Sequence, residues 1–137
     1  MPFVLDNSVV LGWYLQDQAT PYTEAVAQLL KDDRAWVPPL WELELANVLR
    51  TTCLRQRHTA EHAQQVLVQL AQLPIDVDRQ AVAPSELLAL ALRFGLSSYG
   101  AAYLELALRR QLPLATKDSN FAAAAWAAGV GVVTVAG

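Results

Sequence analysis

The stretch Phe3-Val-Leu-Asp6-Asn-Ser8 sets the expected fold, because a run of apolar residues leads directly to an acid. The run Phe3–Asp6 predicts a short, buried strand. In open α/β sheets, ligands bind just beyond the carboxyl ends of the strands. The stretch therefore predicts an α/β sheet and places a carboxylate at the edge where such a sheet binds its ligand.

Short apolar strands and helical segments alternate along the rest of the chain. Further strands are expected at Ala35–Pro38, Pro74–Asp78, Leu112–Thr116 and Val130–Val135. Helices are expected around 11–14 and over about 20–31, 40–57, 59–73, 84–95, 98–110 and 118–128. This alternation predicts an α/β fold, a three-layer-like sandwich with a mostly parallel central sheet flanked by helices.

Length and composition predict one globular domain spanning residues 1–137. Hydrophobic residues make up 54% of the chain and charged residues 17%, which favours a substantial core and argues against disorder. Cys53 is the only cysteine, so no intrachain disulfide is expected. No basic region precedes the short apolar run at the N-terminus, and we expect a soluble cytoplasmic protein without a signal peptide or membrane span.

The net charge of −3 gives no general basic surface for holding nucleic acid. The clearest basic patch is Arg50, Arg55 and Arg57. Its simpler interpretation is a solvated helix end. Any contact with nucleic acid must therefore use a local patch, with or without a metal ion.

Three carboxylates are expected at one edge of the sheet. Asp6 and Asp118 each follow a predicted strand, and Glu44 lies near the start of the helix after another strand. Carboxylate oxygens are ligands for hard cations such as Mg²⁺, so convergence of these acids predicts a divalent-cation site. Alternatively, Asp6 and Asp118 are helix N-caps, and Glu44 is a partly exposed helix residue.

Four segments carry a resemblance to a known family: Val4–Ser8, Glu44–Leu49, Leu96–Ala107 and Pro113–Asp118. Their order and spacing resemble PIN-domain ribonuclease toxins of the VapC type, which belong to type II toxin–antitoxin systems. The resemblance runs from Phe3 to Val135. It implies a PIN-like fold, a magnesium- or manganese-dependent endoribonuclease acting on structured cellular RNA, a VapB-like antitoxin partner and a homodimer.

By the same resemblance, Asp6, Glu44 and Asp118 match the acids of the family. Asp6 is then the expected direct metal ligand, and Asp118 binds the metal directly or through water. Glu44 is expected to hold metal-bound water or assist proton transfer. Ser8 and Thr116 match the small hydroxyl residues that support the site.

One position departs from the family pattern. The third acid of the family normally follows the tyrosine at position 99, and this chain has Gly100 there. Loss of that carboxylate is expected to lower both metal affinity and activity. Glu105 lies five residues further along the helix, turned by about 140°, so we expect it to serve as a surface or polar-network acid instead.

The residues also bear on three other functions. A non-catalytic module that binds the antitoxin in a repressor complex remains the main alternative. A receiver domain would need paired acids after the first strand, where this chain has Asp6-Asn7. The spacing His58-Thr-Ala-Glu-His62 matches a zinc-hydrolase motif, but Thr59 is expected to cap the helix and leave His58 outside it.

Aromatic residues suggest a second surface. Trp13, Tyr14, Leu40 and Trp41 flank Asp6 and Glu44, and are expected to form either a groove for the antitoxin or ordinary helix packing. Trp36 and Trp126 are expected to pack in the core or on the sheet.

Overall fold

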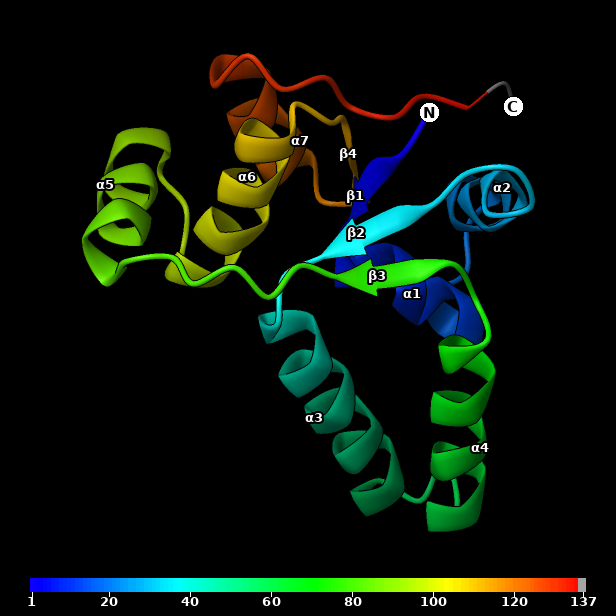
Figure 1. Cartoon of the computed structure of the whole chain (residues 1–137). Helices are drawn as coiled ribbons and strands as arrows, with labels where there is room; N and C mark the ends of the chain where they lie inside the picture. The colour runs from blue at the N-terminus through cyan, green and yellow to red at the C-terminus, as the bar shows by residue number, and fades with distance from the viewer. Residues whose placement is uncertain (136–137) are drawn as a thin grey trace.

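The computed structural model describes residues 1–135 and shows a parallel sheet flanked by helices (Figure 1). The strands are β1 (Phe3–Leu5), β2 (Ala35–Val37), β3 (Ile75–Val77) and β4 (Leu114–Ala115). The α-helices are α1 (Asn7–Tyr14), α2 (Pro21–Leu29), α3 (Leu40–Leu54), α4 (Ala60–Ala71), α5 (Pro84–Phe94), α6 (Ser98–Arg110) and α7 (Ser119–Ala127), with a short 3₁₀ helix at Gln16–Gln18. The predicted α/β fold is confirmed.

All four strands are parallel, in the order β3-β2-β1-β4. Val4 of β1 pairs with Trp36 on one side and with Leu114 on the other. All three residues of β1 are buried, which explains why the strand is apolar throughout. The carboxyl ends of the strands share one edge, and Asp6 leaves β1 at that edge.

Side-chain caps define several helix starts. Thr20 and Thr23 form a capping box before α2, with Pro21 at its first position. Thr59 accepts a hydrogen bond from the backbone N–H of His62 and caps α4. His58 therefore lies outside α4, as the sequence predicts.

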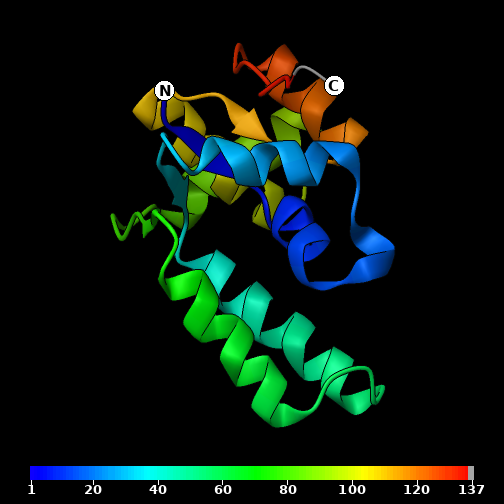
Figure 2. The same cartoon turned by 90° about the vertical axis from the view of Figure 1, so that its right-hand side faces the viewer.

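The helices occupy distinct places around the sheet. Helix α6 packs against β1, and α5 packs on the far side of α6 (Figure 1). Helices α3 and α4 pack against each other and extend together away from the sheet (Figure 2). Among residues 1–135 no single helix is both long and apolar enough to cross a membrane, and only α5 with α6, bent by 100° at their junction, passes that test as a pair by length and composition.

A glycine allows α1 and α2 to approach closely. A Cβ on Gly12 would lie 2.5 Å from Cγ2 of Thr23, so no larger residue fits there without displacement. Beside it, the indole N–H of Trp13 donates to the Thr23 carbonyl at 2.7 Å. This contact fixes α1, the helix that begins directly after Asp6.

Three local predictions are wrong. The expected strand Val130–Val135 is reduced to one isolated bridge, between Leu114 and Val132. β4 has only two residues, so it offers a short edge for further pairing. Trp126 is 62% exposed on α7 instead of packing in the core.

The third error concerns α3, in which the apolar spacing of the sequence at Leu43, Ala46, Val48 and Leu49 predicts the buried face. The structure instead buries Trp41, Leu45, Leu49 and Thr52. Leu43 is 73% exposed. The true buried positions recur at intervals of three and four residues, which is the helical period, but the face is rotated from the expected one.

Candidate functional site

Asp6 is held by two hydroxyl groups at the carboxyl edge of the sheet. Ser8 Oγ and Thr116 Oγ1 both donate to Asp6 Oδ2, at 2.7 Å and 2.8 Å. The same two hydroxyls accept hydrogen bonds from the backbone N–H groups of Lys117 and Asp118, both at 3.1 Å. The carboxylate of Asp6 is thus oriented by residues from α1 and from the segment after β4, while Oδ1 lies outside this pair of bonds.

Burial raises the pKa of the Asp6 carboxyl above its ordinary value, and the nearby charge of Asp118 raises it slightly further. The hydrogen bonds from Ser8 and Thr116 oppose this shift but do not reverse it. A carboxylate kept in such a place is costly unless a positive charge joins it. This is the electrostatic setting expected of a cation ligand.

Glu44 comes to the same region from α3. Its Oε1 accepts a hydrogen bond of 2.6 Å from the phenol of Tyr103 on α6. Burial raises the pKa of Glu44, the charge of Asp6 raises it further, and the bond from Tyr103 lowers it. The pKa of Tyr103 is raised by burial first and then by Glu44, so its phenol stays protonated and acts as a donor.

Asp6 and Glu44 line one open pocket of about 610 Å³. That volume falls within the usual range for ligand sites. Its lining combines the polar side chains of Asp6, Asn7, Ser8, Glu44 and Asn47 with apolar ones, including the exposed Leu43 and Tyr99. The lining residues are Asp6, Asn7, Ser8, Leu11, Leu40, Leu43, Glu44, Asn47, Val48 and Tyr99.

Asp118 lies near this pocket without lining it. Its Oδ1 accepts hydrogen bonds from the backbone N–H groups of Asn120 and Phe121, at 2.9 Å and 3.1 Å, and so caps α7. The alternative role as an N-cap therefore describes Asp118 in this structure. Asp6 occupies the corresponding position before α1, but its side chain makes no capping bond.

Gly100 lies in the first turn of α6, at the position where the family pattern has an acid. Its N–H donates to Ser97 Oγ, the cap of the helix, at 3.1 Å. The atoms nearest to a Cβ added at Gly100 belong to Leu96 and Ser97, at 3.5 Å or more, which is ordinary contact. The fold therefore leaves room for a side chain at this position.

The residues present fit a divalent cation held by few protein ligands. Across residues 1–135, no three side chains among His, Cys, Asp and Glu gather closely enough to form a metal-binding group. Mg²⁺, however, often takes only one or two carboxylates and completes its shell with water and phosphate. Asp6 and Glu44 meet that requirement, and the buried Oδ1 of Asn7 has no hydrogen-bond partner within the described chain, which is the kind of group a water or ion can satisfy.

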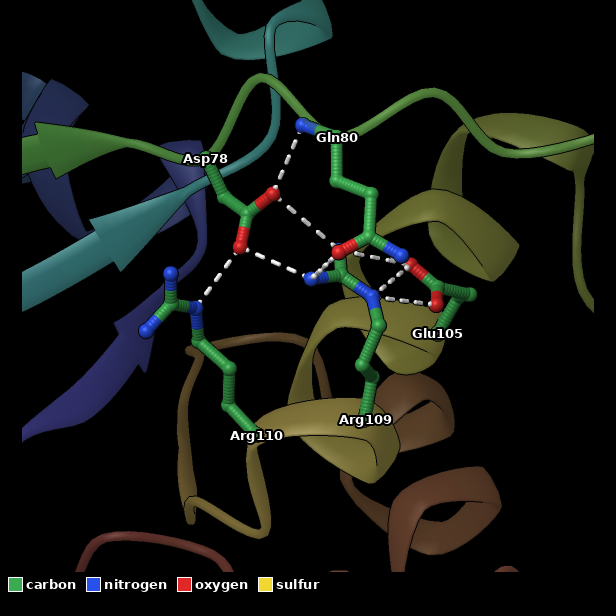
Figure 3. Close-up of polar contacts among 5 residues, drawn as sticks. All are labelled: Asp78, Gln80, Glu105, Arg109 and Arg110. Carbon is green, nitrogen blue, oxygen red and sulfur yellow. Dashed lines mark hydrogen bonds and ion pairs between the residues drawn. The ribbon is translucent and has the colours of Figure 1, made fainter.

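A second charged cluster lies beyond the end of β3 (Figure 3). The side chain of Asp78 is only 3% exposed, and it bonds both Arg109 Nη1, at 2.8 Å, and Arg110 Nε, at 2.7 Å. Arg109 also pairs with Glu105 one turn earlier on α6. Glu105 thus belongs to this network, as expected from its place on the helix, and does not line the Asp6 pocket.

The other candidates from the sequence are dispersed. Arg57 pairs with Asp17 at 3.2 Å in an exposed position, and Arg50 and Arg55 are also exposed. Trp41 is buried, and Trp13 packs partly against the core, so ordinary packing accounts for both tryptophans of the expected groove.

Tyr103, Asn47 and Tyr99 were missed by sequence reasoning. Tyr103 follows Gly100 by three residues, so the two share one face of α6. That spacing is the one signal in the sequence that could have identified it. Asn47 follows Glu44 by the same interval on α3 and lines the pocket beside it.

Comparisons with known proteins agree with this geometry. The family model described as the PIN domain matches residues 3–127. The fold is similar to that in the crystal structure of VapBC2 from Rickettsia felis bound to a promoter DNA fragment, with a TM-score of 0.69, 14% identity, and coverage of 99% of this chain and 100% of that chain.

It is also similar to the crystal structure of PAE2754 from Pyrobaculum aerophilum, with a TM-score of 0.62, 19% identity, and coverage of 90% of this chain and 84% of that chain. No curated protein sequence matches the chain. At these identities the two solved structures establish the likeness of fold.

Proposed function

Because this chain belongs to the PIN-domain family, we propose that it is the toxin of a toxin–antitoxin pair, a divalent-metal-dependent endoribonuclease weakened by Gly100. PIN domains are generally nucleases. The observation that carries the proposal is the pocket lined by the two carboxylates Asp6 and Glu44 at the carboxyl edge of the sheet. Two carboxylates with raised pKa values in one pocket favour a cation site over a purely structural one.

In this proposal the chain's own residues divide the work. Asp6, fixed by Ser8 and Thr116, would hold Mg²⁺ or Mn²⁺, and Asp118 would contribute directly or through water. Glu44 would orient water and accept a proton from it, the role of a general base. The bound cation supplies electrostatic stabilisation of the phosphate in the transition state.

The rim of the pocket suits a single-stranded stretch of RNA. Tyr99 is 61% exposed and Leu43 is 73% exposed, and both lie beside the acids. Bases that are not paired stack well on exposed aromatic rings. We therefore assign Tyr99 to contact a base next to the phosphate that is cut.

The partners follow from the same family membership. The matched Rickettsia felis structure is VapBC2 bound to promoter DNA. We therefore propose that a VapB-like antitoxin is the partner of this chain. A homodimer and a cytoplasmic location belong to the same proposal. The domain is proposed to span residues 1–137.

Gly100→Asp tests the nuclease function. We expect metal-dependent RNA cleavage to rise on the order of 10²-fold, since a carboxylate is restored beside the cation. The change fits sterically, and an acid at this third helical position also suits the Ser97 cap. Cleavage of a structured RNA is measured with Mg²⁺, with Mn²⁺ and with EDTA.

Gly100→Asn is the matched control, because it adds a side chain of the same size without the charge. It should leave cleavage near the level of the parent chain. Absence of metal-dependent cleavage in the Asp variant would remove the nuclease proposal.

A second candidate, a non-catalytic module that binds antitoxin, is favoured by the lack of any three-ligand acid group within residues 1–135. It predicts that a co-expressed antitoxin binds equally well before and after Asp6→Ala. It also predicts that Gly100→Asp gives no cleavage, so the same variant separates the two functions.

A further inference from the structure

One buried side chain of α6 contacts an acid of the pocket, and neither family membership nor the acid pattern assigns it a role. Tyr103 donates its phenol hydrogen to Glu44 Oε1 at 2.6 Å. It is 2% exposed, which makes it one of the largest fully buried side chains. The contact joins α6 to α3 across the region where Asp6 lies.

The ring of Tyr103 is held firmly. It packs edge-to-face against Phe121 of α7, with ring centroids 6.4 Å apart and an interplanar angle of 71°. Phe121 is itself buried and belongs to the turn capped by Asp118. The phenol oxygen therefore has a fixed position relative to α7 as well as to α6.

Glu44, by contrast, has little else to hold it. It is only half-buried on a helix whose neighbouring Leu43 is exposed. Among residues 1–135, Tyr103 alone donates a hydrogen bond to the carboxylate of Glu44. Without it the flexible glutamate side chain can turn outward into solvent and gain both hydration and rotamer entropy.

We propose that Tyr103 is a positioning residue, whose phenol holds Glu44 toward Asp6 and leaves Glu44 Oε2 free to face a divalent cation or its water. The inference rests on the proposed metal-dependent function. It gives α6 a part in the site although Gly100 supplies no ligand. Tyr103 acts through Glu44 and does not itself touch the cation.

The experiment measures Mn²⁺ binding by calorimetry, in the parent chain and in the Gly100→Asp background. Tyr103→Phe keeps the ring and removes the donor, so the thermal midpoint should stay close to that of the parent. Mn²⁺ affinity should fall about tenfold, which corresponds to losing one hydrogen bond to a charged group. In a Glu44→Gln background the same change should have no further effect, because the carboxylate that Tyr103 positions is already gone.

Tyr22→Phe is the matched control. It removes a phenol hydrogen bond of 2.8 Å to the Val133 carbonyl, which reaches neither acid. Its Mn²⁺ affinity should equal that of the parent chain. A similar loss of Mn²⁺ affinity in Tyr103→Phe and Tyr22→Phe would show a general effect on folding and would overturn the inference.

The two levels of the proposal fail differently. If Mn²⁺ binds and Asp6→Asn abolishes binding, but Tyr103→Phe binds as tightly as the parent, the positioning role is wrong and the metal site stands. If neither the parent nor the Gly100→Asp chain binds Mn²⁺, the proposed function fails, and the role of Tyr103 falls with it. An undiminished effect of Tyr103→Phe in the Glu44→Gln background would also overturn the inference, since Tyr103 would then act by another route.

Discussion

At the scale of single residues, the buried carboxylate of Asp6 lowers the stability of the fold when it is ionised. Its folded pKa is raised mainly by burial, so the folded state holds the proton more tightly than the unfolded state does. The ionised carboxylate therefore lowers stability above the folded pKa. This cost disappears as the pH falls below the unfolded value of about 3.9.

We accordingly expect Asp6→Asn to raise the thermal midpoint of the metal-free protein at pH 7. Asn keeps an oxygen to accept the bonds from Ser8 and Thr116, while the buried charge is removed. The gain over the parent should shrink in a second series of melts near pH 3.5. A lower midpoint for Asp6→Asn at pH 7 would show that the buried charge is already compensated in the folded state.

The shared carboxyl edge of a parallel sheet predicted that Asp6 and Asp118 lie in one region, and the family resemblance added Ser8 and Thr116 to it. Sequence reasoning did not foresee Tyr103, since an apolar helix face gives no hint that one aromatic residue carries a donor to another helix. Capping of α7 by Asp118, in contrast, was the stated alternative to metal binding, and the structure shows that bond. The contact of Tyr103 depends on how α6 is placed against α3, which no local pattern encodes.

At the scale of elements, a buried ionic cluster connects β3 to α6. Asp78 follows β3 and pairs with Arg109 and Arg110, and the guanidinium of Arg110 lies 3.5 Å from the ring centre of Trp36 on β2. The bond from Arg109 is the main cause that lowers the pKa of Asp78. The cluster therefore fixes α6, the helix that carries Tyr103, against β2 and the end of β3.

Asp78→Asn should lower the free energy of unfolding by roughly 2–4 kcal/mol, because two partly solvated arginines lose their buried partner. The depressed folded pKa means that the stabilisation is present above the unfolded value of about 3.9 and is lost as the pH falls toward the folded value. Urea unfolding at pH 7 and again below pH 4 should thus show a large difference from the parent and then a smaller one.

Asp76→Asn is the control for this measurement. Asp76 pairs with Arg34 in an exposed position, where such a pair is worth less than about 1 kcal/mol. If Asp76→Asn and Asp78→Asn lower the free energy of unfolding equally, then burial of Asp78 adds nothing to the stability that its ion pairs provide.

Helix ends were the most predictable elements. Thr20, Thr59 and Gly95 mark starts and an end by local chemistry, and the structure uses each as predicted. The buried face of α3 was wrong because Leu43, which looks like a core residue, lines the acid pocket instead. An apolar residue kept at a binding site breaks the pattern by which a core is recognised.

At the scale of the whole molecule, a net charge of −3 leaves little general attraction for RNA. Under the proposed function, RNA binding would then depend on a few local contacts and on a cation between the acids and a phosphate. We expect the affinity for a labelled single-stranded RNA to fall on replacing Mg²⁺ with EDTA. The logarithm of the binding constant should change with the logarithm of salt concentration by a slope of only about −2 to −3, as for three or four phosphate contacts.

Fluorescence anisotropy across a salt series measures both quantities. Arg50→Ala should make the slope shallower if the exposed arginine touches the RNA. A steep slope that is the same in Mg²⁺ and in EDTA would point to a basic surface that the described chain does not show.

The position of β1 governs when the site can exist at all. Asp6 receives its second hydroxyl bond from Thr116, 110 residues later in the chain, and β1 gains its second neighbour only with Leu114–Ala115. A ribosome adding about 5–20 residues per second needs roughly 5–20 s to bridge that interval. Nascent chains and fragments that stop before Leu114 therefore lack the second strand neighbour of β1 and the Thr116 bond to Asp6, and the carboxylate is fully held only after Thr116 has been synthesised.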